Sequence, residues 1–426
     1  MNCTEAVDFL DSLIGMGIKR GLNHTRRLAG RLGNPQEAFP SVLIAGTNGK
    51  GSTAAYLEAI LREAGIRTGL FTSPHLVNVR ERIRVEGRMI GEADFAASMK
   101  RVSTVSKEEC DGLPTYFEAL TLLAFDHFAR SGVEVAVIEV GLGGRLDCTN
   151  ITEPVLSVVT NIGFDHEAWL GRDLLSITHE KAGIFRKGRP TLSGARRKDV
   201  AAGMEKEAMG VGALFRGPAG TIREDATGWR LELDGVSRSF PYPLQPGRHQ
   251  LDNAALAVRS ALALRSLGWM IHDDAIVEGV AGTRWPGRLE LVHSSPDLYI
   301  DGAHNPDGCR VFLDFVRGLP HRRKILLFAA MEDKPAPLML KTLLPAFDAC
   351  WITSLPMERC AAPEALAEKS KAFDVEVEPD VERAVAKAIG RAGASGAVLT
   401  AGSLYLAGAV RNLFLPEPKA SWGSGL

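Results

Sequence analysis

Short runs of apolar residues alternate along the chain with longer segments in which apolar residues recur every three or four positions. The short runs are nearly continuous and rich in valine and isoleucine, which is typical of strands buried on both faces of a parallel sheet. The pattern predicts strands at residues 42–45, 69–72, 133–140 and 155–159. It predicts helices at residues 8–14, 53–64, 116–129 and 249–267. This alternation indicates an α/β fold with a mostly parallel sheet.

The pattern changes twice. Residues 213–244 hold short alternating pieces around Asp234-Gly235, which predicts a hairpin in a small antiparallel appendage. Beyond residue 288 the alternation restarts, with strands expected at residues 298–300, 324–329, 350–353, 375–377 and 397–400. A chain of 426 residues is too long for one ordinary core. We therefore expect a first α/β domain at residues 1–283, a linker at 284–296, and a smaller Rossmann-like α/β domain at 297–426.

Composition narrows the class of protein. Hydrophobic residues make up 45% of the chain and charged residues 24%, which is typical of a soluble globular protein. The net charge of -1 argues against a broad surface for nucleic acid or anionic membrane. No apolar run is long enough for a transmembrane helix, and the N-terminus lacks the basic region of a secretory signal. The six cysteines form no C-x-x-C pair, which suits reduced thiols in a cytoplasmic enzyme; they are Cys3, Cys110, Cys148, Cys309, Cys350 and Cys360.

A glycine-rich turn follows the first predicted strand. Residues 46–52 read GTNGKGS and precede the predicted helix at 53–64. A glycine-rich turn between a strand and the start of a helix is an arrangement that binds phosphate through backbone N–H groups. Lys50 can contact the β- and γ-phosphates, and Ser52 can offer a hydroxyl to Mg²⁺. The general pattern would need glycine at Ile44 and a hydroxyl at Gly51, so the match is imperfect, but the context favours phosphate binding.

Polar residues end two further strands of the first domain. Glu139 interrupts an apolar run at a strand's carboxyl end, where open α/β sheets bind ligands, so we expect it to bind a hard cation. His166 follows another strand, and beside Glu139 a metal ligand and a solvated histidine are about equally supported. The residue pattern alone does not distinguish Lys181 from a solvated lysine.

The second domain offers a third polar strand end. Asp301 and His304 follow its first predicted strand, where a ribose hydroxyl or a phosphate could be held. Asn305-Pro306 also fits an ordinary helix cap, so both interpretations stay open. Arg288, in the linker, could reach a phosphate across a cleft, although linker arginines are more often solvated.

Taken together, these segments closely resemble the folate-handling branch of the Mur ligase family, the dihydrofolate synthases and folylpolyglutamate synthases. The matching motifs run in family order over nearly the whole chain. They are AGTNGKGS at 45–52, SPHL at 73–76, ERI at 81–83, TYFE at 115–118, EVGLGGRLD at 139–147, TN at 149–150, FDH at 164–166, EKAGI at 180–184, PGR at 286–288, DGAHNP at 301–306 and GS at 402–403. The family's loop has the form G-T-N-G-K-G-[ST], which accounts for the imperfect phosphate loop.

The resemblance implies an ATP-dependent amide ligase of folate biosynthesis and one-carbon metabolism. Such an enzyme adds L-glutamate to dihydropteroate and to folate polyglutamates through an acyl phosphate, and releases ADP and phosphate. It implies ATP, Mg²⁺ at two sites, a monovalent cation and a carbamylated Lys181. We expect small-molecule substrates, no nucleic-acid or membrane partner, and a cytoplasmic monomer.

The resemblance also implies site residues. The catalytic residues are Lys50, His166 and Lys181. The ATP contacts are Asn48, Gly49, Lys50, Gly51, Ser52, Asn253, Arg288, Asp301 and His304. The metal ligands are Ser73, Glu139, His166 and the carbamylated Lys181. The pterin or folate contacts are Thr115, Tyr116, Phe117, Leu146, Asp147 and Cys148. The chain departs from the family at Pro335, where an aspartate is common, and at Cys148, where alanine is commoner.

Three alternatives remain. The enzyme could have one of the two folate activities alone. It could be a cell-wall ligase acting on a nucleotide sugar, but that class has an added N-terminal domain, and only about 40 residues precede the phosphate loop. It could be a nucleotide-binding regulator without catalysis, which predicts degraded metal or lysine positions, whereas Glu139, His166 and Lys181 are all present.

Overall fold

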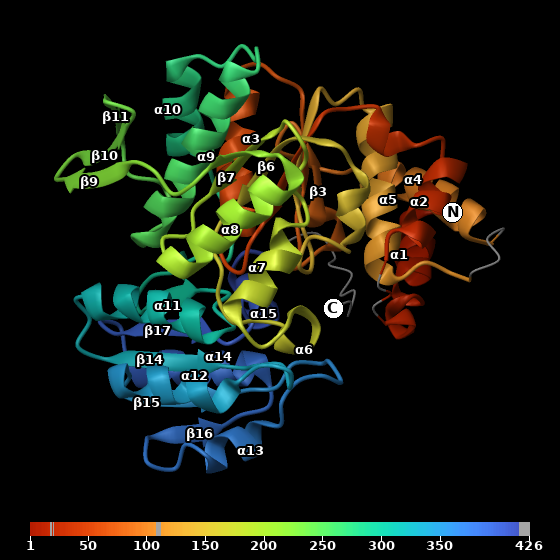
Figure 1. Ribbon diagram of the computed structural model, residues 1–426. Helices are drawn as coiled ribbons and strands as arrows, with labels where there is room; N and C mark the ends of the chain where they lie inside the picture. The colour runs from red at the N-terminus through yellow and green to blue at the C-terminus, as the bar shows by residue number, and fades with distance from the viewer. Residues whose placement is uncertain (18, 20, 108–111, 417–426) are drawn as a thin grey trace.

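The computed structural model describes residues 1–17, 19, 21–107 and 112–416 (Figure 1). Cys110 and the last ten residues of the expected C-terminal domain lie outside these ranges. The predicted fold class is confirmed: there are two α/β sheets, each with helices around it, and a small antiparallel sheet projects beside α9 (His249–Ser266) and α10 (Asp273–Gly282). The division of the chain at residues 283 and 297 stays a prediction.

The large sheet has eight strands in the order β4-β3-β2-β5-β1-β6-β7-β8. All neighbours pair in parallel except β2 with β3 and β3 with β4. Its strands are β1 (Ser41–Ala45), β2 (Thr68–Phe71), β3 (Ile83–Val85), β4 (Arg88–Met89), β5 (Val135–Glu139), β6 (Pro154–Val159), β7 (Pro190–Ser193) and β8 (Leu214–Arg216). Because β1 lies centrally, the phosphate loop that follows it opens at the middle of the sheet's carboxyl edge.

Successive residues of each strand point to opposite faces, and each face has its own core. Leu43 and Ala45 of β1 pack in one cluster, and Val42 and Ile44 in the other. The first face is covered by α1 (Cys3–Asp11), α2 (Asn23–Arg31), α4 (Glu92–Lys107), α5 (Tyr116–Arg130) and α8 (Lys198–Val211). The second is covered by α3 (Lys50–Glu63), α9 (His249–Ser266) and α10 (Asp273–Gly282). This two-sided burial explains why the strands read as unbroken apolar runs.

The smaller elements complete the first part of the chain. They are α6 (Glu167–Leu170), α7 (Leu174–Ala182) and the 3-10 helices η1 (Ile14–Met16), η2 (Pro35–Glu37), η3 (Val79–Arg82) and η4 (Cys148–Ile151). The predicted limits of the first helix, residues 8–14, were wrong, because α1 spans Cys3–Asp11. Asn2 and Glu5 form a capping box that starts α1 at Cys3, and the chain tightens into η1 after Leu13.

Residues 213–244 also differ from the prediction. The hairpin around Asp234-Gly235 is present as β10 (Gly228–Leu233) and β11 (Val236–Phe240), with β9 (Thr221–Asp225) on the other edge. Leu214–Arg216, however, is β8, and it pairs in parallel with β7 as the last strand of the large sheet. Its three residues are too few for their alternation to indicate which sheet they join.

The second α/β sheet has six strands in the order β12-β13-β17-β14-β15-β16. They are β12 (Glu290–His293), β13 (Asp297–Ile300), β14 (Lys324–Phe328), β15 (Ala349–Ile352), β16 (Val375–Val377) and β17 (Ala397–Ala401). The surrounding helices are α11 (Pro306–Gly318), α12 (Ala336–Leu343), η5 (Leu344–Ala346), α13 (Pro363–Glu368), α14 (Val381–Ala392) and α15 (Leu404–Phe414). β12 lies inside the expected linker and pairs antiparallel with β13, so Asp301 follows the second strand of this sheet, not the first.

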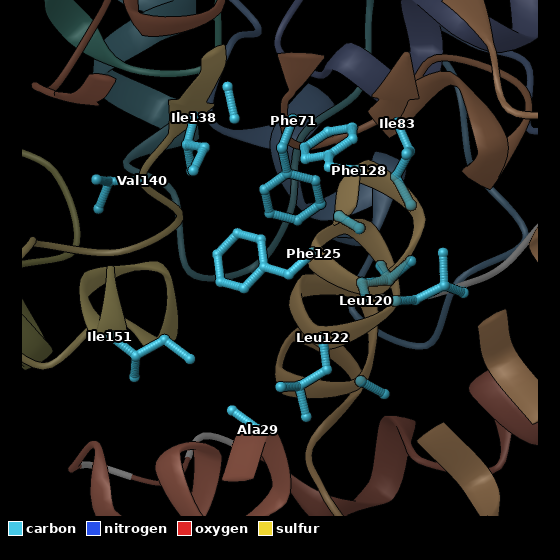
Figure 2. Packing of buried hydrophobic residues seen from close by; sticks show 14 of the residues in the cluster. Ala29, Phe71, Ile83, Leu120, Leu122, Phe125, Phe128, Ile138, Val140 and Ile151 are labelled. Atoms are coloured by element: carbon cyan, nitrogen blue, oxygen red, sulfur yellow. The ribbon is translucent and has the colours of Figure 1, made fainter. Parts of the chain in front are cut away.

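Phe125 gives a direct test of the first core. Its ring is fully buried on α5 among other apolar side chains (Figure 2). The ring meets Phe39 edge to face, with the ring centres 6.1 Å apart. Phe125→Ala is expected to lower the free energy of unfolding by about 3–5 kcal/mol, because it removes the ring and leaves a cavity. Urea denaturation should show a lower midpoint at unchanged slope. Met209→Ala, at a 74% exposed position, should cost less than about 0.5 kcal/mol.

Candidate active site

One cavity of about 900 Å³ opens at the carboxyl edge of the large sheet and continues to the second sheet. All residues predicted for the site line it. They are Asn48, Gly49, Lys50, Gly51, Ser52, Ser73, Thr115, Tyr116, Phe117, Glu139, Leu146, Asp147, Cys148, His166, Lys181, Asn253, Arg288, Asp301 and His304. Segments far apart in sequence therefore meet around one space.

The phosphate loop ends where α3 begins. Gly49 caps the helix with a φ of 81°, a left-handed conformation that glycine adopts without strain. Lys50 is the first helical residue, and its Nζ donates to the Thr47 carbonyl at 3.2 Å and lies 4.0 Å from Glu139. A helix N-terminus with free N–H groups and a lysine beside it is an anion site.

Gly51, the departure from the general pattern, has a steric reason. A Cβ at this position would lie 3.2 Å from the Glu139 carboxylate and 3.3 Å from the Trp285 indole. The Arg84 guanidinium covers the same indole at 5.5 Å from a ring centre. Sequence reasoning missed Trp285, because a tryptophan in a predicted linker gives no sign of which loop it packs against.

Glu139 is the buried carboxylate of the site. Its Oε2 accepts a hydrogen bond from the Ser73 N–H at 3.0 Å, whereas the Lys50 contact is to Oε1. Burial raises its pKa, and Lys50 and the Ser73 N–H oppose that rise. A buried carboxylate with one lysine 4.0 Å away and a serine beside it suits a hard cation, which oxygen ligands bind. Within the described residues, no group of three or more His, Cys, Asp or Glu side chains is arranged to hold a metal.

His166 and Asp165 lie together after β6. His166 has a φ of 52°, and burial lowers its pKa to about 4, so its ring is neutral at pH 7. A neutral imidazole can ligate a metal.

Asp165, to which sequence reasoning gave no role, contacts Lys334 at 2.7 Å and receives a 3.3 Å hydrogen bond from Asn305. Burial alone would raise the pKa of Asp165, but His304, His166 and Lys334 hold it far below its usual range.

Lys181 is buried on α7 and was the least conspicuous candidate in the sequence. Its Nζ donates to the Gly46 carbonyl at 2.8 Å, directly at the phosphate loop. Burial, and after it the charge of Lys50, lowers the pKa of Lys181 to about 7. A large fraction of this amine is therefore neutral near pH 7, which ordinary surface lysines are not.

The second sheet contributes the far wall. Asp301 is buried and accepts N–H groups from Leu289 at 2.9 Å and Ala303 at 2.8 Å. Burial raises its pKa, and Arg288 opposes that rise. His304 is oriented by its own turn, with Nδ1 2.8 Å from the Gly302 carbonyl.

Contacts between asparagines join this wall to the phosphate loop. The Asn305 amide donates to the Asn48 side chain at 2.9 Å, and the reverse contact measures 3.3 Å. Asn253, on α9, reaches the other side of the same loop, since a Cβ on Gly49 would lie 2.3 Å from its oxygen. The phosphate loop is thus held between α9 and the second sheet.

The opposite end of the cavity is the expected folate pocket. Thr115 caps α5 in a capping box with Glu118, and the Phe117 ring stacks on Phe71 with centroids 5.7 Å apart. Tyr116 is buried, and the Arg82 guanidinium lies 5.5 Å from its ring centre. The expected folate pocket therefore begins at the N-terminus of α5, where the cap, the ring stacking and the Arg82 contact hold the side chains in place.

The second loop that is expected to contact folate follows β5. Leu146 is 40% exposed at the mouth of the cavity. Asp147 accepts hydrogen bonds from Leu142 and Thr149, so its carboxylate shapes the loop. Cys148 is buried, with its sulfur 3.1 Å from the Thr121 hydroxyl and with a raised pKa, caused by burial, that keeps it a thiol.

Comparisons with known proteins agree with this arrangement. The family model for the Mur ligase middle domain matches residues 44–193, and that for the Mur ligase glutamate ligase domain matches residues 287–404. The dihydrofolate synthase/folylpolyglutamate synthase of Bacillus subtilis is 32% identical over 96% of this chain and 98% of its own length. The chain belongs to the Mur ligase family. Within that family its relatives are those of the folate branch.

A further relative is longer. A Halobacterium salinarum protein named "Probable bifunctional folylpolyglutamate synthase/dihydropteroate synthase" is 38% identical over 95% of the chain. The chain spans about half the length of that relative and of a similar Haloferax volcanii protein. The activities of those longer proteins are therefore not transferred as a whole.

Two solved structures show what related folds hold. E. coli FolC in complex with DHPP and ADP has a TM-score of 0.89 and 33% identity, with 97% of each chain covered. A bifunctional folylpolyglutamate synthase/dihydrofolate synthase with Mn, AMPPNP and L-glutamate bound has a TM-score of 0.87 and 31% identity, over 97% of this chain and 98% of that one. In the part of this chain that the structure describes, no helix is long and apolar enough to cross a bilayer.

Proposed function

We propose that this Mur ligase is an ATP-dependent amide ligase that adds L-glutamate to dihydropteroate and to folate polyglutamates. The observation that carries this proposal is the single cavity, in which a phosphate loop, a buried carboxylate and a buried lysine of lowered pKa lie between an aromatic pocket and the second sheet. Solved relatives bind ADP, AMPPNP, Mn and L-glutamate, which supports ATP and a divalent cation as ligands here.

The chemistry follows from this arrangement. The substrate carboxylate attacks the γ-phosphorus of ATP, the bond to the β-phosphate oxygen breaks, and an acyl phosphate and ADP result. The glutamate amine then attacks the acyl carbon, loses a proton, and displaces inorganic phosphate. Phosphoryl transfer needs positioning and charge neutralisation, which Lys50 and the α3 N-terminus supply. A cavity between two sheets limits the access of water to the intermediate and so limits its hydrolysis.

The ion and modification sites are part of the proposal. Ser73, Glu139, His166 and a carbamylated Lys181 would hold Mg²⁺ at two positions, where it would neutralise phosphate charge. Carbamylation joins the neutral Lys181 amine to CO₂, gives a carbamate and releases one proton. The lowered pKa of Lys181 supports this reaction, because only the neutral amine is nucleophilic. A monovalent cation and a monomeric state complete what the family resemblance implies.

Dihydropteroate is favoured as a substrate by one comparison. The Halobacterium salinarum relative is named a folylpolyglutamate synthase joined with a dihydropteroate synthase, and dihydropteroate is the product that the second name denotes. A chain similar to about half of such a protein suits that product as its substrate. The alternative is an enzyme with only one activity, since the Lacticaseibacillus casei relative, 31% identical, is named a folylpolyglutamate synthase alone.

Product analysis tests the proposal. Purified protein is incubated with ATP, Mg²⁺ and L-glutamate, with either dihydropteroate or tetrahydrofolate monoglutamate as acceptor. We expect one glutamate to be added to each acceptor with stoichiometric ADP. If dihydropteroate gives no product, the enzyme lacks the dihydrofolate synthase activity. If neither acceptor gives a product, the ligase assignment is refuted.

Gly49→Ala tests the phosphate loop. The new Cβ would lie 2.3 Å from the Asn253 oxygen, so we expect the KM for ATP to rise at least about 10-fold. Gly65→Ala is a matched control at the far end of α3, because Gly65 has a similar φ of 79° and no atom within 4 Å of a Cβ. Both variants should lose about 1 kcal/mol of stability from backbone strain. Equal KM values in the two variants would contradict the steric role of Asn253.

A further inference from the structure

Trp285 is a linker residue to which sequence reasoning and the proposed chemistry give no role. Its indole is half-buried and packs against the core on the α3 side of the large sheet. It does not line the large cavity of about 900 Å³. Instead it lines a second cavity of about 30 Å³, which shares Gly51, Glu139 and Arg288 with the first. Trp285 therefore lies beside the site and can act on it only through its neighbours.

Two contacts fix the indole to the large sheet. A Cβ on Gly51, the second residue of α3, would lie 3.3 Å from both Nε1 and Cζ2 of the ring. The Arg84 guanidinium, on β3, lies 5.5 Å from a ring centre, which is within the range of a cation–π contact. Arg84 is itself held, since its Nε donates to the Glu81 carbonyl at 3.3 Å. The indole thus contacts both the start of α3 and β3.

The backbone on the two sides of Trp285 is bound to different sheets. Before it, the Thr283 hydroxyl donates to a carbonyl of α10, which covers the large sheet. After it, the Gly287 carbonyl accepts a hydrogen bond from the Gly302 N–H at 3.2 Å, in the turn after β13. The chain therefore passes from one sheet to the other between Thr283 and Gly287. Pro286 stiffens this crossing, because its ring fixes φ.

Arg288 follows the crossing and lies between the two sheets. A Cβ on Gly302 would lie 2.4 Å from its Nη1, so the guanidinium packs directly on the turn after β13. Burial raises the pKa of Asp301 and of Glu139, and the charge of Arg288 opposes both rises. The guanidinium therefore stands near one buried carboxylate of each sheet, in the lining of the large cavity. Its position depends on where the linker leaves the large sheet, which the Trp285 contacts fix.

We propose that Trp285 is a positioning residue that places the Arg288 guanidinium in the nucleotide cavity by anchoring the crossing between the two sheets. This inference rests on the proposed function, because it assumes that the large cavity binds ATP and that Arg288 contacts it. Since Trp285 does not line that cavity, its loss should weaken ATP binding only as far as it displaces Arg288. Trp285→Phe keeps an aromatic face for Arg84 and should retain most of the effect.

A double-mutant cycle tests this coupling. Calorimetry gives the dissociation constant of ATP for wild type, Trp285→Ala, Arg288→Met and the double variant. We expect each single change to raise the constant about 10-fold and the double change to raise it no more than about 20-fold, whereas independent residues would give about 100-fold. Trp285→Phe should stay within about 3-fold of wild type. An unchanged constant in Trp285→Ala, or a rise of about 100-fold in the double variant, would overturn the proposal.

Trp269→Ala is the matched control for lost packing. Trp269 is a second half-buried tryptophan against the same core, and it does not line the large cavity. Both alanine variants should have a lower Tm than wild type, because each loses apolar contacts. Trp269→Ala should nevertheless bind ATP within about 2-fold of wild type. Equal weakening of ATP binding in the two variants would indicate a general packing effect and refute the positioning role.

Arg84→Met tests the anchor without removing the indole. Because Arg84 does not line the large cavity, its effect on ATP should pass through Trp285. We expect the dissociation constant of ATP to rise about 3-fold in Arg84→Met, and not to rise further when this change is added to Trp285→Ala. Arg88→Met, at an exposed position on β4, is the control and should bind ATP like wild type. The same 3-fold rise in the Trp285→Ala background would contradict this path.

Direct binding separates this result from the proposed function. A wild-type protein that binds ATP but forms no glutamate adduct would fail only the proposed function. A wild-type protein that forms the adduct, with ATP binding unchanged in Trp285→Ala, would fail only the positioning role.

Discussion

Lys50→Ala is expected to lower kcat for glutamate-dependent ADP release by about 10³-fold, the larger of the two main mutational effects. The Lys50 amine lies at the first turn of α3, 4.0 Å from Glu139, where the transferred phosphoryl group would carry its charge. Removing it leaves that charge without its point cation in a cavity of low dielectric. The measurement is steady-state ADP release with saturating glutamate and acceptor.

The control for this variant is Lys206→Ala, at an exposed position on α8, which should keep full activity. Circular dichroism should show that both variants stay folded. If the folded Lys50→Ala enzyme keeps a kcat within about 10-fold of wild type, the assignment of Lys50 to the phosphate site is wrong.

Lys181→Ala is expected to lower kcat by about 10²–10³-fold, and a short carboxylate such as acetate should restore part of the activity. The physical reason is that a carbamate is a carboxylate-like anion, which a small acid can replace in the space left by the side chain. Lys187→Ala, on the exposed surface nearby, is the control. A fully active Lys181→Ala enzyme would refute the carbamate.

The same lysine predicts a pH dependence. The pKa of Lys181 falls from its ordinary value to about 7, so the neutral amine that reacts with CO₂ dominates above pH 7 and is lost below it. Wild-type enzyme freed of CO₂ should thus recover activity with bicarbonate quickly at pH 8 and poorly at pH 6. Lys181→Ala should show no bicarbonate response. Equal recovery at both pH values would contradict the assignment.

Features that depend on nearby residues in sequence could be predicted. The strand before Gly46 and the helix after Gly49 follow from local apolar pattern and turn chemistry, and Glu139 stands out because it interrupts a buried run. Features that depend on a distant partner could not be predicted. β12 is a strand because β13 lies beside it, and β8 joins the large sheet because β7 ends next to it.

The site shows the same limit. Lys181 looks like any solvated lysine in sequence, and only its burial beside the Gly46 carbonyl distinguishes it. Trp285 and Asp165 gave no sign of their role, since their partners, Gly51 and Lys334, come from other parts of the chain. The family resemblance supplied what pattern and spacing could not.

Transfer of oxygen-18 from the substrate carboxylate to phosphate tests the acyl-phosphate ligase mechanism most directly. Dihydropteroate labelled in both carboxylate oxygens is incubated with ATP, Mg²⁺, L-glutamate and the enzyme, and the released phosphate is examined by ³¹P NMR. We predict one oxygen-18 atom in each phosphate, because the labelled carboxylate oxygen leaves with phosphorus when glutamate displaces it. Unlabelled phosphate, formed together with the glutamate adduct, would contradict an acyl-phosphate intermediate in this cavity.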